Sequence, residues 1–194
     1  MPPTVAIIAA GAMGAAVARR LTTAGCTVLT NLDGRSPATR QRARDAGMTD
    51  VPFSDIPHRA ALTLSILPPS EAHALAARWL AAWGADDEKP GSRRGEERRT
   101  GTGTGTVYVD CNAVSPQTVK DIAGLFTGSG VGFVDAGIIG GPPREGYDPT
   151  FYASATGEDR GALDAFEALR AGGLKITCLE GEGVGVGDAS ALKM

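Results

Sequence analysis

The chain has 194 residues and a formal net charge of -3, with hydrophobic residues making up 42% and charged residues 21% of the sequence. These proportions are typical of a globular protein with a full core and exclude an intrinsically disordered chain. The slightly acidic balance argues against a nucleic-acid-binding protein, and no apolar run reaches the roughly 18 residues that a membrane-spanning helix needs. We therefore expect neither nucleic acid nor a membrane among its partners.

The three cysteines, Cys26, Cys111 and Cys178, are widely separated and form no Cys-x-x-Cys pair. Neither of the two histidines stands in a metal-binding pattern, so no metal site is expected. The first four residues lack the basic region of a signal peptide. A reduced, cytoplasmic protein is the simplest interpretation of these features.

Short apolar runs alternate with helical patterns along the chain. Residues 4–9 form a run typical of a strand buried on both faces, and residues 12–24 follow as a helix with Met13, Val17 and Leu21 on one side. This alternation predicts an α/β fold of the Rossmann type, with a doubly wound, mainly parallel sheet. Further strands are expected at 27–30, 61–67, 107–110, 132–135, 151–155 and 175–179, and helices at 37–46, after Pro68-Pro69 with Ser70 as cap, at 115–126 and at 162–170.

Residues 85–106 interrupt this pattern with acidic, basic, glycine and threonine residues and almost no apolar side chain. Such a segment cannot bury enough surface to offset the entropy lost on ordering, which predicts a disordered surface insertion. Alternatively, the arginines of this segment form an anion-binding patch, although the interleaved acidic residues weaken its field.

A glycine turn follows the first strand. The dinucleotide fingerprint Gly-x-Gly-x-x-Gly is met here by Ala9-Ala10-Gly11-Ala12-Met13-Gly14, with alanine at the first position. The alanine is tolerable if the turn does not require a positive φ. We predict that Gly11, Ala12, Met13 and Gly14 hold a pyrophosphate at the helix N-terminus, where free N–H groups favour negative charge.

The end of the second strand indicates which nucleotide is bound. NAD-specific domains usually place Asp or Glu there to bond the ribose hydroxyls, but Asn31 stands in that position. Arg35 and Ser36 follow, and a guanidinium beside a hydroxyl suits a 2′-phosphate. Asp33 favours NAD instead, since its carboxylate could reach a ribose hydroxyl. The pattern favours NADP over NAD, with Asn31, Arg35 and Ser36 as ligands.

Three more segments complete a recognisable combination. Residues 66–69, Ile-Leu-Pro-Pro, end the third predicted strand, residues 135–141 read Asp-Ala-Gly-Ile-Ile-Gly-Gly, and Lys193 follows a glycine-rich turn. Together with Gly11-Ala12-Met13-Gly14, they resemble the β-hydroxyacid dehydrogenase family, which includes 3-hydroxyisobutyrate and 6-phosphogluconate dehydrogenases. The 6-phosphogluconate-dehydrogenase-like branch is the most similar.

The resemblance implies hydride transfer between a hydroxy acid and NADP, with Lys193 as the general base. It implies substrate contacts at Ile139, Gly140 and Gly141, although the family usually has serine where this chain has Ile139. It further implies that Leu67, Pro68 and Asn112 line the cofactor cleft.

Asn112 has a second interpretation, as a cap for the helix beginning near Ser115. Cys111, with no histidine near it in sequence, is interpreted as a buried small residue rather than a nucleophile.

The same resemblance implies a division of the chain. Residues 1–181 would form the NADP-binding Rossmann domain, and residues 182–194 would begin the interdomain helix, with the family's C-terminal helical domain absent. A homodimer is expected only where that domain is present, and an apolar face near residues 189–192 would otherwise be exposed. Two alternatives remain open: a non-catalytic NADP-binding module, and reduction of a C=N bond as in imine reductases. The substrate is not specified by the sequence.

Overall fold

The computed structural model describes residues 2–85 and 105–192. The predicted insertion therefore lies outside the described residues except for Ala85, Gly105 and Thr106. None of the helices in these two ranges is long and apolar enough to cross a membrane.

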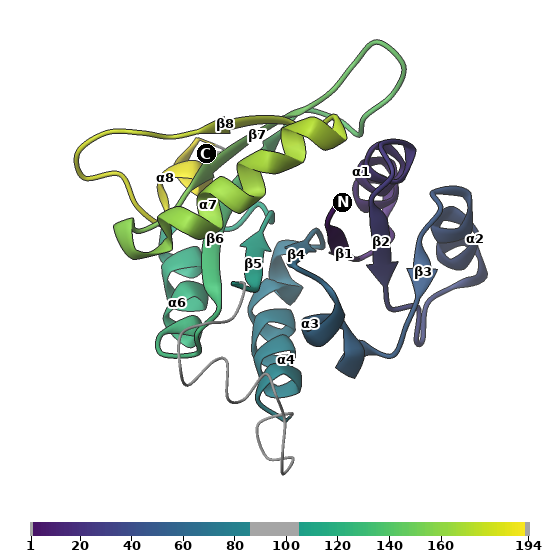
Figure 1. Cartoon of the computed structure of the whole chain (residues 1–194), viewed down its shortest axis with the longest axis horizontal. Coiled ribbons are helices and arrows are strands. Elements are labelled where there is room, and N and C mark those ends of the chain that lie inside the picture. The colour runs from purple at the N-terminus through teal and green to yellow at the C-terminus, as the bar shows by residue number, and fades with distance from the viewer. Residues whose placement is uncertain (1, 86–104, 193–194) are drawn as a thin grey trace.

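One sheet runs through the described residues, in the order β3-β2-β1-β4-β5-β6-β7-β8 (Figure 1). All neighbouring strands are parallel except β6 and β7, which are antiparallel. The predicted α/β fold of the Rossmann type, with a mainly parallel sheet, is confirmed. The strands are β1 (Thr4–Ile8), β2 (Thr27–Thr30), β3 (Thr49–Asp50), β4 (Leu62–Ser65), β5 (Val107–Asp110), β6 (Gly132–Ile139), β7 (Thr150–Ser154) and β8 (Lys175–Cys178).

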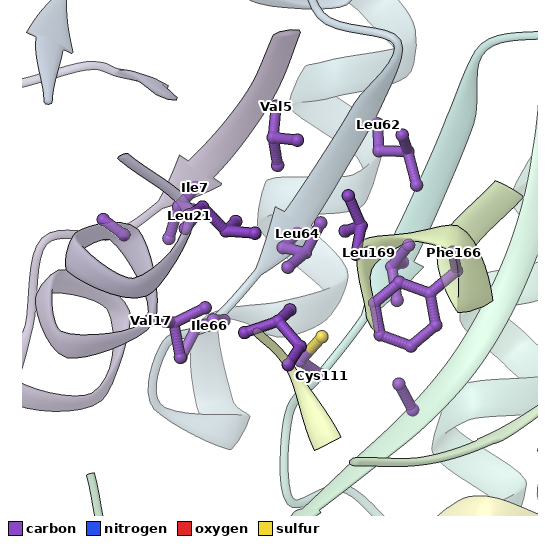
Figure 2. Close-up of a cluster of buried hydrophobic side chains, with 14 of the residues drawn as sticks. Val5, Ile7, Val17, Leu21, Leu62, Leu64, Ile66, Cys111, Phe166 and Leu169 are labelled. Atoms are coloured by element: carbon purple, nitrogen blue, oxygen red, sulfur yellow. The ribbon is translucent and has the colours of Figure 1, made fainter. Parts of the chain in front are cut away.

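Helices cover both faces of the sheet. One buried cluster joins the strands to α1 and α7, and Figure 2 shows Val17 and Leu21 of α1 and Phe166 of α7 beside the strand residues Ile7 and Leu64. The other cluster joins the opposite face to α3, α4 and α6. The helices are α1 (Ala12–Thr23), α2 (Pro37–Asp45), α3 (Ile56–Arg59), α4 (Ala72–Gly84), α6 (Pro116–Phe126), α7 (Arg160–Glu167) and α8 (Asp188–Ala191).

Local sequence explains where several of these elements begin. β4 and β5 are buried at every position, as expected for central strands with helices on both faces. Ser36 and Ser115 each accept a hydrogen bond from the backbone N–H three residues later and are each followed by proline, so they cap α2 and α6.

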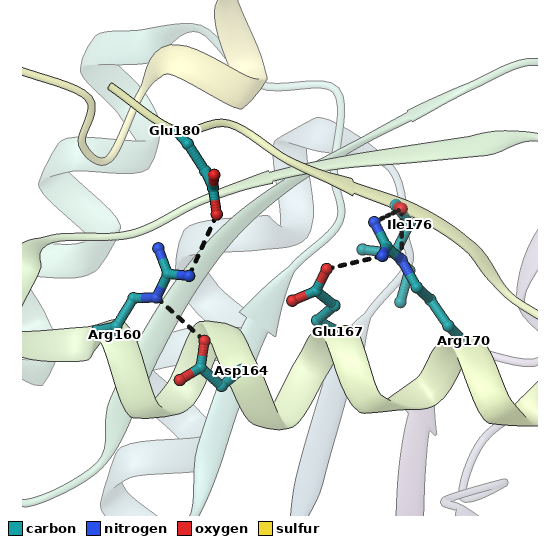
Figure 3. A network of polar contacts seen from close by, with 6 residues as sticks. All are labelled: Arg160, Asp164, Glu167, Arg170, Ile176 and Glu180. Carbon is teal, nitrogen blue, oxygen red and sulfur yellow. Dashed lines mark hydrogen bonds and ion pairs between the residues drawn. The ribbon is translucent and has the colours of Figure 1, made fainter. Parts of the chain in front are cut away.

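α7 and the 3-10 helix that follows it (Ala168–Gly172) carry two arginines that contact β8 and the residues after it. The Arg170 guanidinium donates to the Ile176 carbonyl oxygen at 2.6 and 2.8 Å and pairs with Glu167 at 2.9 Å (Figure 3). Arg160 donates to Glu180 beyond β8 at 3.2 Å. Because these side chains are largely exposed, their charges add little net stability, and β8 itself is placed by its parallel pairing with β7.

Apart from shifts of element ends by a few residues, the structure differs from the sequence prediction in four places. The short elements β3 and α3 were not predicted. Ser70 does not cap α4, because it lies inside the 3-10 turn Pro69–Glu71 and α4 begins only at Ala72. β6 continues from Asp135, its expected end, to Ile139, since antiparallel pairing with β7 extends it.

The fourth difference concerns the end of the described chain. An exposed apolar face was expected near residues 189–192; Ala191 and Leu192 are exposed, but Ala189 and Ser190 are fully buried. α8 packs against β6 and β7, which accounts for this burial.

Candidate functional site

The loops after β1 and β4 meet at the carboxyl edge of the sheet. β1 lies between β2 and β4, so the chain leaves β1 toward one side of the sheet and β4 leads to the other. The Ala9 N–H donates to the Ile66 carbonyl at 2.9 Å and joins the two loops. Open α/β sheets bind ligands outside the strand ends at such a switch point. The predicted phosphate turn and Leu67-Pro68 therefore lie at the place where a ligand is expected.

The two glycines of the phosphate turn differ in their surroundings. A Cβ added to Gly14 would clash with the Ala9 carbonyl oxygen and lie 3.3 Å from Cγ2 of Ile7, so this glycine is required for packing of α1 on β1. A Cβ added to Gly11 would meet nothing within 4 Å. Steric contacts within the protein therefore do not require a glycine at position 11, whereas close approach of a ligand to the backbone would.

Ala9 at the first fingerprint position is compatible with the fold. All described residues with positive φ are glycines, so Ala9 does not adopt a left-handed conformation. The condition under which alanine was expected to be tolerable is met.

The N-terminus of α1 is electrostatically suited to an anion. Gly11 is its N-cap and supplies no side-chain acceptor, and the first turn contains no acidic residue. Ala12 is exposed and Met13 is half-buried against the core. Arg42 of α2 reaches across to the Ala10 carbonyl oxygen at 3.4 Å, a contact that the sequence analysis did not anticipate.

Asn31 is buried beyond the end of β2 and is committed to protein contacts. Its Nδ2 donates to Asp33 Oδ2 at 2.9 Å and to the Val51 carbonyl oxygen at 3.0 Å. It therefore shapes the loop after β2 and holds Asp33 beside it. The first of these bonds engages one oxygen of the exposed Asp33 carboxylate.

Arg35, Ser36 and Arg40 lie together where α2 begins. Arg35 and Ser36 are exposed, and the Ser36 hydroxyl oxygen accepts the Thr39 N–H at 3.2 Å as the cap of α2. Arg40 donates to the Arg35 carbonyl at 3.2 Å and lies 3.9 Å from Asp50. The exposed Arg35 thus belongs to the turn that Ser36 caps, and the Arg40 guanidinium contacts the backbone of that turn.

Asn112 joins the ends of β4 and β5. Its Oδ1 accepts the Leu67 N–H at 2.8 Å, and its Nδ2 donates to the Ser65 hydroxyl at 2.8 Å. The alternative that Asn112 caps the next helix is wrong, because Ser115 performs that role. Asn112 sets the backbone of the loop that carries Leu67, while Pro68 beyond it is exposed.

The predicted substrate segment ends β6. Ile139 is 41% exposed and Gly140 has a φ of 122°. The Gly141 N–H donates to the Tyr147 hydroxyl oxygen at 3.1 Å, so this N–H already has a partner within the protein. The next loop is also tied to α1, because Arg20 pairs with Asp148 at 2.9 Å.

Asp135 is a buried residue at this edge to which the sequence analysis assigned no role, although it begins the segment 135–141. It is fully buried, and its carboxylate accepts hydrogen bonds from Gly187 and Ser190. An acidic residue within an otherwise apolar strand was the available signal, because buried carboxylates need specific partners.

Tyr108 of β5 is fully buried in the sheet. Burial raises the pKa of the Tyr108 phenol above its ordinary value, and nearby Asp110 raises it further. Cys111 is buried, as expected. Among the described residues, no group of three or more potential ligands could hold a metal ion.

A cavity of about 740 Å³ lies elsewhere, where β5 and β6 begin between α6 and α7. It contains none of the predicted site residues. Dinucleotides lie along the open carboxyl edge of a parallel sheet, so the phosphate turn marks the candidate site better than cavity size does.

Lys193, the predicted general base, lies outside the described residues. The described chain ends at Leu192, directly after α8.

No family model matches the chain, and no curated protein matches it. Several solved structures, however, are similar to the chain. The conserved protein MTH1747, of unknown function and described as structurally similar to 3-hydroxyacid dehydrogenases, has 32% identity and a TM-score of 0.75, with 98% of this chain and 61% of that chain covered.

A 3-hydroxyisobutyrate dehydrogenase of Mycobacterium tuberculosis, solved with L-serine, has 19% identity and a TM-score of 0.71 over 100% of this chain and 58% of that one. An imine reductase of Myxococcus stipitatus, solved with NADP+, has 18% identity and a TM-score of 0.65 over 98% of this chain and 58% of that one. The chain thus spans about three fifths of the length of the structures it matches. The resemblance to the N-terminal domain of the β-hydroxyacid dehydrogenases is confirmed.

Proposed function

We propose, from this resemblance, that the chain is the NADP-binding part of an oxidoreductase of the β-hydroxyacid dehydrogenase type. The observation that carries the proposal is the contrast between the two glycines of the phosphate turn. Gly14 is required for packing, whereas the side of Gly11 where a Cβ would stand is open. In dinucleotide-binding turns the second glycine admits the pyrophosphate and the third allows helix and strand to pack.

The residues present fit a dinucleotide. Backbone N–H groups at the start of α1 would hold the pyrophosphate, since no side chain caps this helix and no acid opposes an anion in its first turn. The Asn112 amide would hold the Leu67 loop against the cofactor. When bound, the nicotinamide would accept or supply a hydride at its ring, while the protein fixes its orientation.

A preference for NADP over NAD is part of this proposal. Arg35 is exposed beside the Ser36 turn and Arg40 lies next to it, so two guanidinium groups would face a 2′-phosphate. One oxygen of the Asp33 carboxylate accepts a hydrogen bond from Asn31, so it would be less available to bind a ribose hydroxyl.

On the substrate side we propose Lys193 as the general base for the hydroxyl proton. This assignment rests on its place in the sequence after the glycine-rich turn and α8. Ile139, Gly140 and Gly141 would border the substrate. Because the Gly141 N–H is bonded to Tyr147, the substrate contact here would fall more on Ile139 and Gly140 than on the Gly141 N–H.

The direct test is a parallel titration with NADPH and NADH by calorimetry. We expect NADPH to bind at least about tenfold more tightly, a difference of about 1.4 kcal/mol. The Arg35→Ala variant should lose this preference by weakening NADPH alone, whereas Arg59→Ala, in a distant exposed helix end, should not. Equal affinities in the wild-type chain would contradict the NADP assignment, and absence of binding of either nucleotide would refute the proposed function.

The catalytic assignment requires the whole protein and a substrate screen. With a panel of 3-hydroxy acids, Lys193→Ala should retain NADPH binding and lose turnover, while Lys175→Ala should retain both. Undiminished turnover of Lys193→Ala would remove the lysine from the mechanism.

Reduction of a C=N bond is the second candidate function. Imine reductases are among the similar structures, and Ile139 offers an apolar surface where the family usually has a hydroxyl. Turnover of cyclic imines without turnover of hydroxy acids would favour it. If neither class reacts although NADPH binds, the chain serves as a cofactor-binding module without catalysis of its own. We also propose that the protein forms a homodimer only where the C-terminal helical domain is present, and light scattering of the whole protein would test this.

A further inference from the structure

Asp135 forms a network that joins the middle of β6 to the chain after β8. Its Oδ2 accepts the backbone N–H groups of Gly187 at 2.9 Å and Ser190 at 3.0 Å, and its Oδ1 accepts the Ser190 hydroxyl at 2.7 Å. The donors are 52 and 55 residues away in sequence. One fully buried carboxylate therefore holds both the last residue of the glycine-rich turn and α8.

Ser154 of β7 closes the same network. Its hydroxyl donates to Asp135 at 3.4 Å and accepts the Ala189 N–H at 3.1 Å. Three N–H groups at the start of α8 are thus bonded to strand side chains, which satisfies groups that the helix itself leaves unpaired. α8 has only four residues and cannot persist without such contacts.

The glycine-rich turn is shaped to reach this carboxylate. Gly187 has a φ of 106°, a left-handed conformation that favours glycine, and a Cβ there would lie 2.9 Å from Cε of Lys120 on α6. Asp135 pairs in register with Asp110, the last residue of β5, so the anchor stands at the carboxyl end of the parallel strands. α8 begins at the same edge of the sheet as the phosphate turn.

We propose that Asp135 is a positioning residue, which fixes the start of α8 and so determines where the chain leaves the sheet edge after Leu192. Its catalytic consequence rests on the proposed function, because Lys193 is the next residue. The carboxylate acts through the backbone of Gly187 and Ser190 rather than by touching a substrate. Its negative charge suits this role, since four hydrogen-bond donors converge on it and an anion is favoured near a helix N-terminus.

Two variants and a matched control test this assignment in the whole chain. Asp135→Asn retains the shape and removes the charge, and Asp135→Ala removes every contact. Asp159→Asn is the control, because the Asp159 carboxylate also accepts a backbone N–H of β6, that of Phe133 at 3.2 Å, but at the opposite end of the strand. Melting temperature and NADPH affinity report whether the remaining fold is intact.

The first readout is hydrogen exchange of the backbone amides of residues 187–192. We expect exchange to be at least about tenfold faster in Asp135→Ala, with a smaller increase in Asp135→Asn, because the charge-assisted bonds that oppose local opening are lost. Asp159→Asn should exchange like the wild type in this segment. Wild-type exchange rates in Asp135→Ala would overturn the proposal. If Asp135→Ala does not fold, the same comparison is made with Asp135→Asn, and wild-type exchange in that variant is likewise contrary.

The second readout is the pH dependence of trace acetylation of Lys193 by acetic anhydride, relative to the exposed Lys175 in the same sample. A purely structural role of Asp135 would leave the ratio of Lys193 to Lys175 acetylation unchanged from the wild type at every pH. That result would refute positioning even if backbone amide exchange is faster. A ratio that moves in both Asp135 variants but not in Asp159→Asn supports it.

Failure of the proposed function would look different. It would appear in the wild-type chain as absent NADPH binding, or in Lys193→Ala as undiminished turnover, and neither result depends on Asp135.

Discussion

Substituting each glycine of the phosphate turn by alanine adds one methyl group and should separate the effects on stability from those on nucleotide binding. In Gly14→Ala the new Cβ meets the Ala9 carbonyl oxygen and stands 3.2 Å from the carbonyl carbon, so the backbone of the turn at Ala9 or of α1 must shift. Overpacking of this kind costs about 1–3 kcal/mol. At roughly 2–4 °C per kcal/mol for a domain of this size, the melting temperature should fall by several degrees.

Gly11→Ala should behave in the opposite way. The position has a φ of -68° and a ψ of -174°, which alanine adopts without strain, and the added methyl meets no protein atom within 4 Å. The loss of a favourable N-cap and the reduced entropy of the unfolded chain are each worth about 0.5–1 kcal/mol and oppose each other. The free energy of unfolding should therefore change by less than about 1 kcal/mol.

Thermal unfolding and NADPH calorimetry on the same two proteins check both halves. Gly11→Ala should weaken NADPH binding by at least about tenfold, since the methyl occupies the space left for the pyrophosphate. Wild-type affinity in Gly11→Ala would refute the placement of the pyrophosphate on this turn. Wild-type stability of Gly14→Ala would refute the packing role deduced for the third glycine.

Three further predictions concern the surroundings of the site. Asn112→Ala should lower the free energy of unfolding in urea by about 2–4 kcal/mol, because the Leu67 N–H loses its acceptor and a buried hydroxyl loses its donor. Because the pKa of the buried Tyr108 phenol is raised, the phenol ionises first in the unfolded chain; its contribution to the free energy of unfolding is therefore fully present below about pH 10 and falls by about 1.4 kcal/mol per pH unit above it. In urea titrations at pH 8 and 11, the free energy of unfolding of Tyr108→Phe should decrease less between the two pH values than that of the wild type. A double-mutant cycle on Arg20 and Asp148 should give a coupling below about 1 kcal/mol that shrinks in salt, since both side chains are 36% exposed.

Much of the fold follows from local sequence. β2 and β5 begin and end where their apolar runs do, and α2 and α6 begin at Pro37 and Pro116, each preceded by a capping serine. These signals are local because a strand buried on both faces reads as an apolar run, and a cap needs only a hydroxyl and the N–H three residues on. The phosphate turn belongs with them, since strand, glycines and helix are contiguous.

Tertiary structure decided the features that depend on residues distant in sequence. The antiparallel pairing of β6 with β7 carries Asp135 into a strand interior, and the bond from Asn112 to the Leu67 loop crosses 45 residues. Neither can be predicted from spacing, because a hydrogen bond between separate strands depends on their order and register in the sheet. The same holds for the different surroundings of Gly11 and Gly14: the motif identifies both glycines, but only the packing of α1 on β1 shows that one is required by the protein and that the other faces open space.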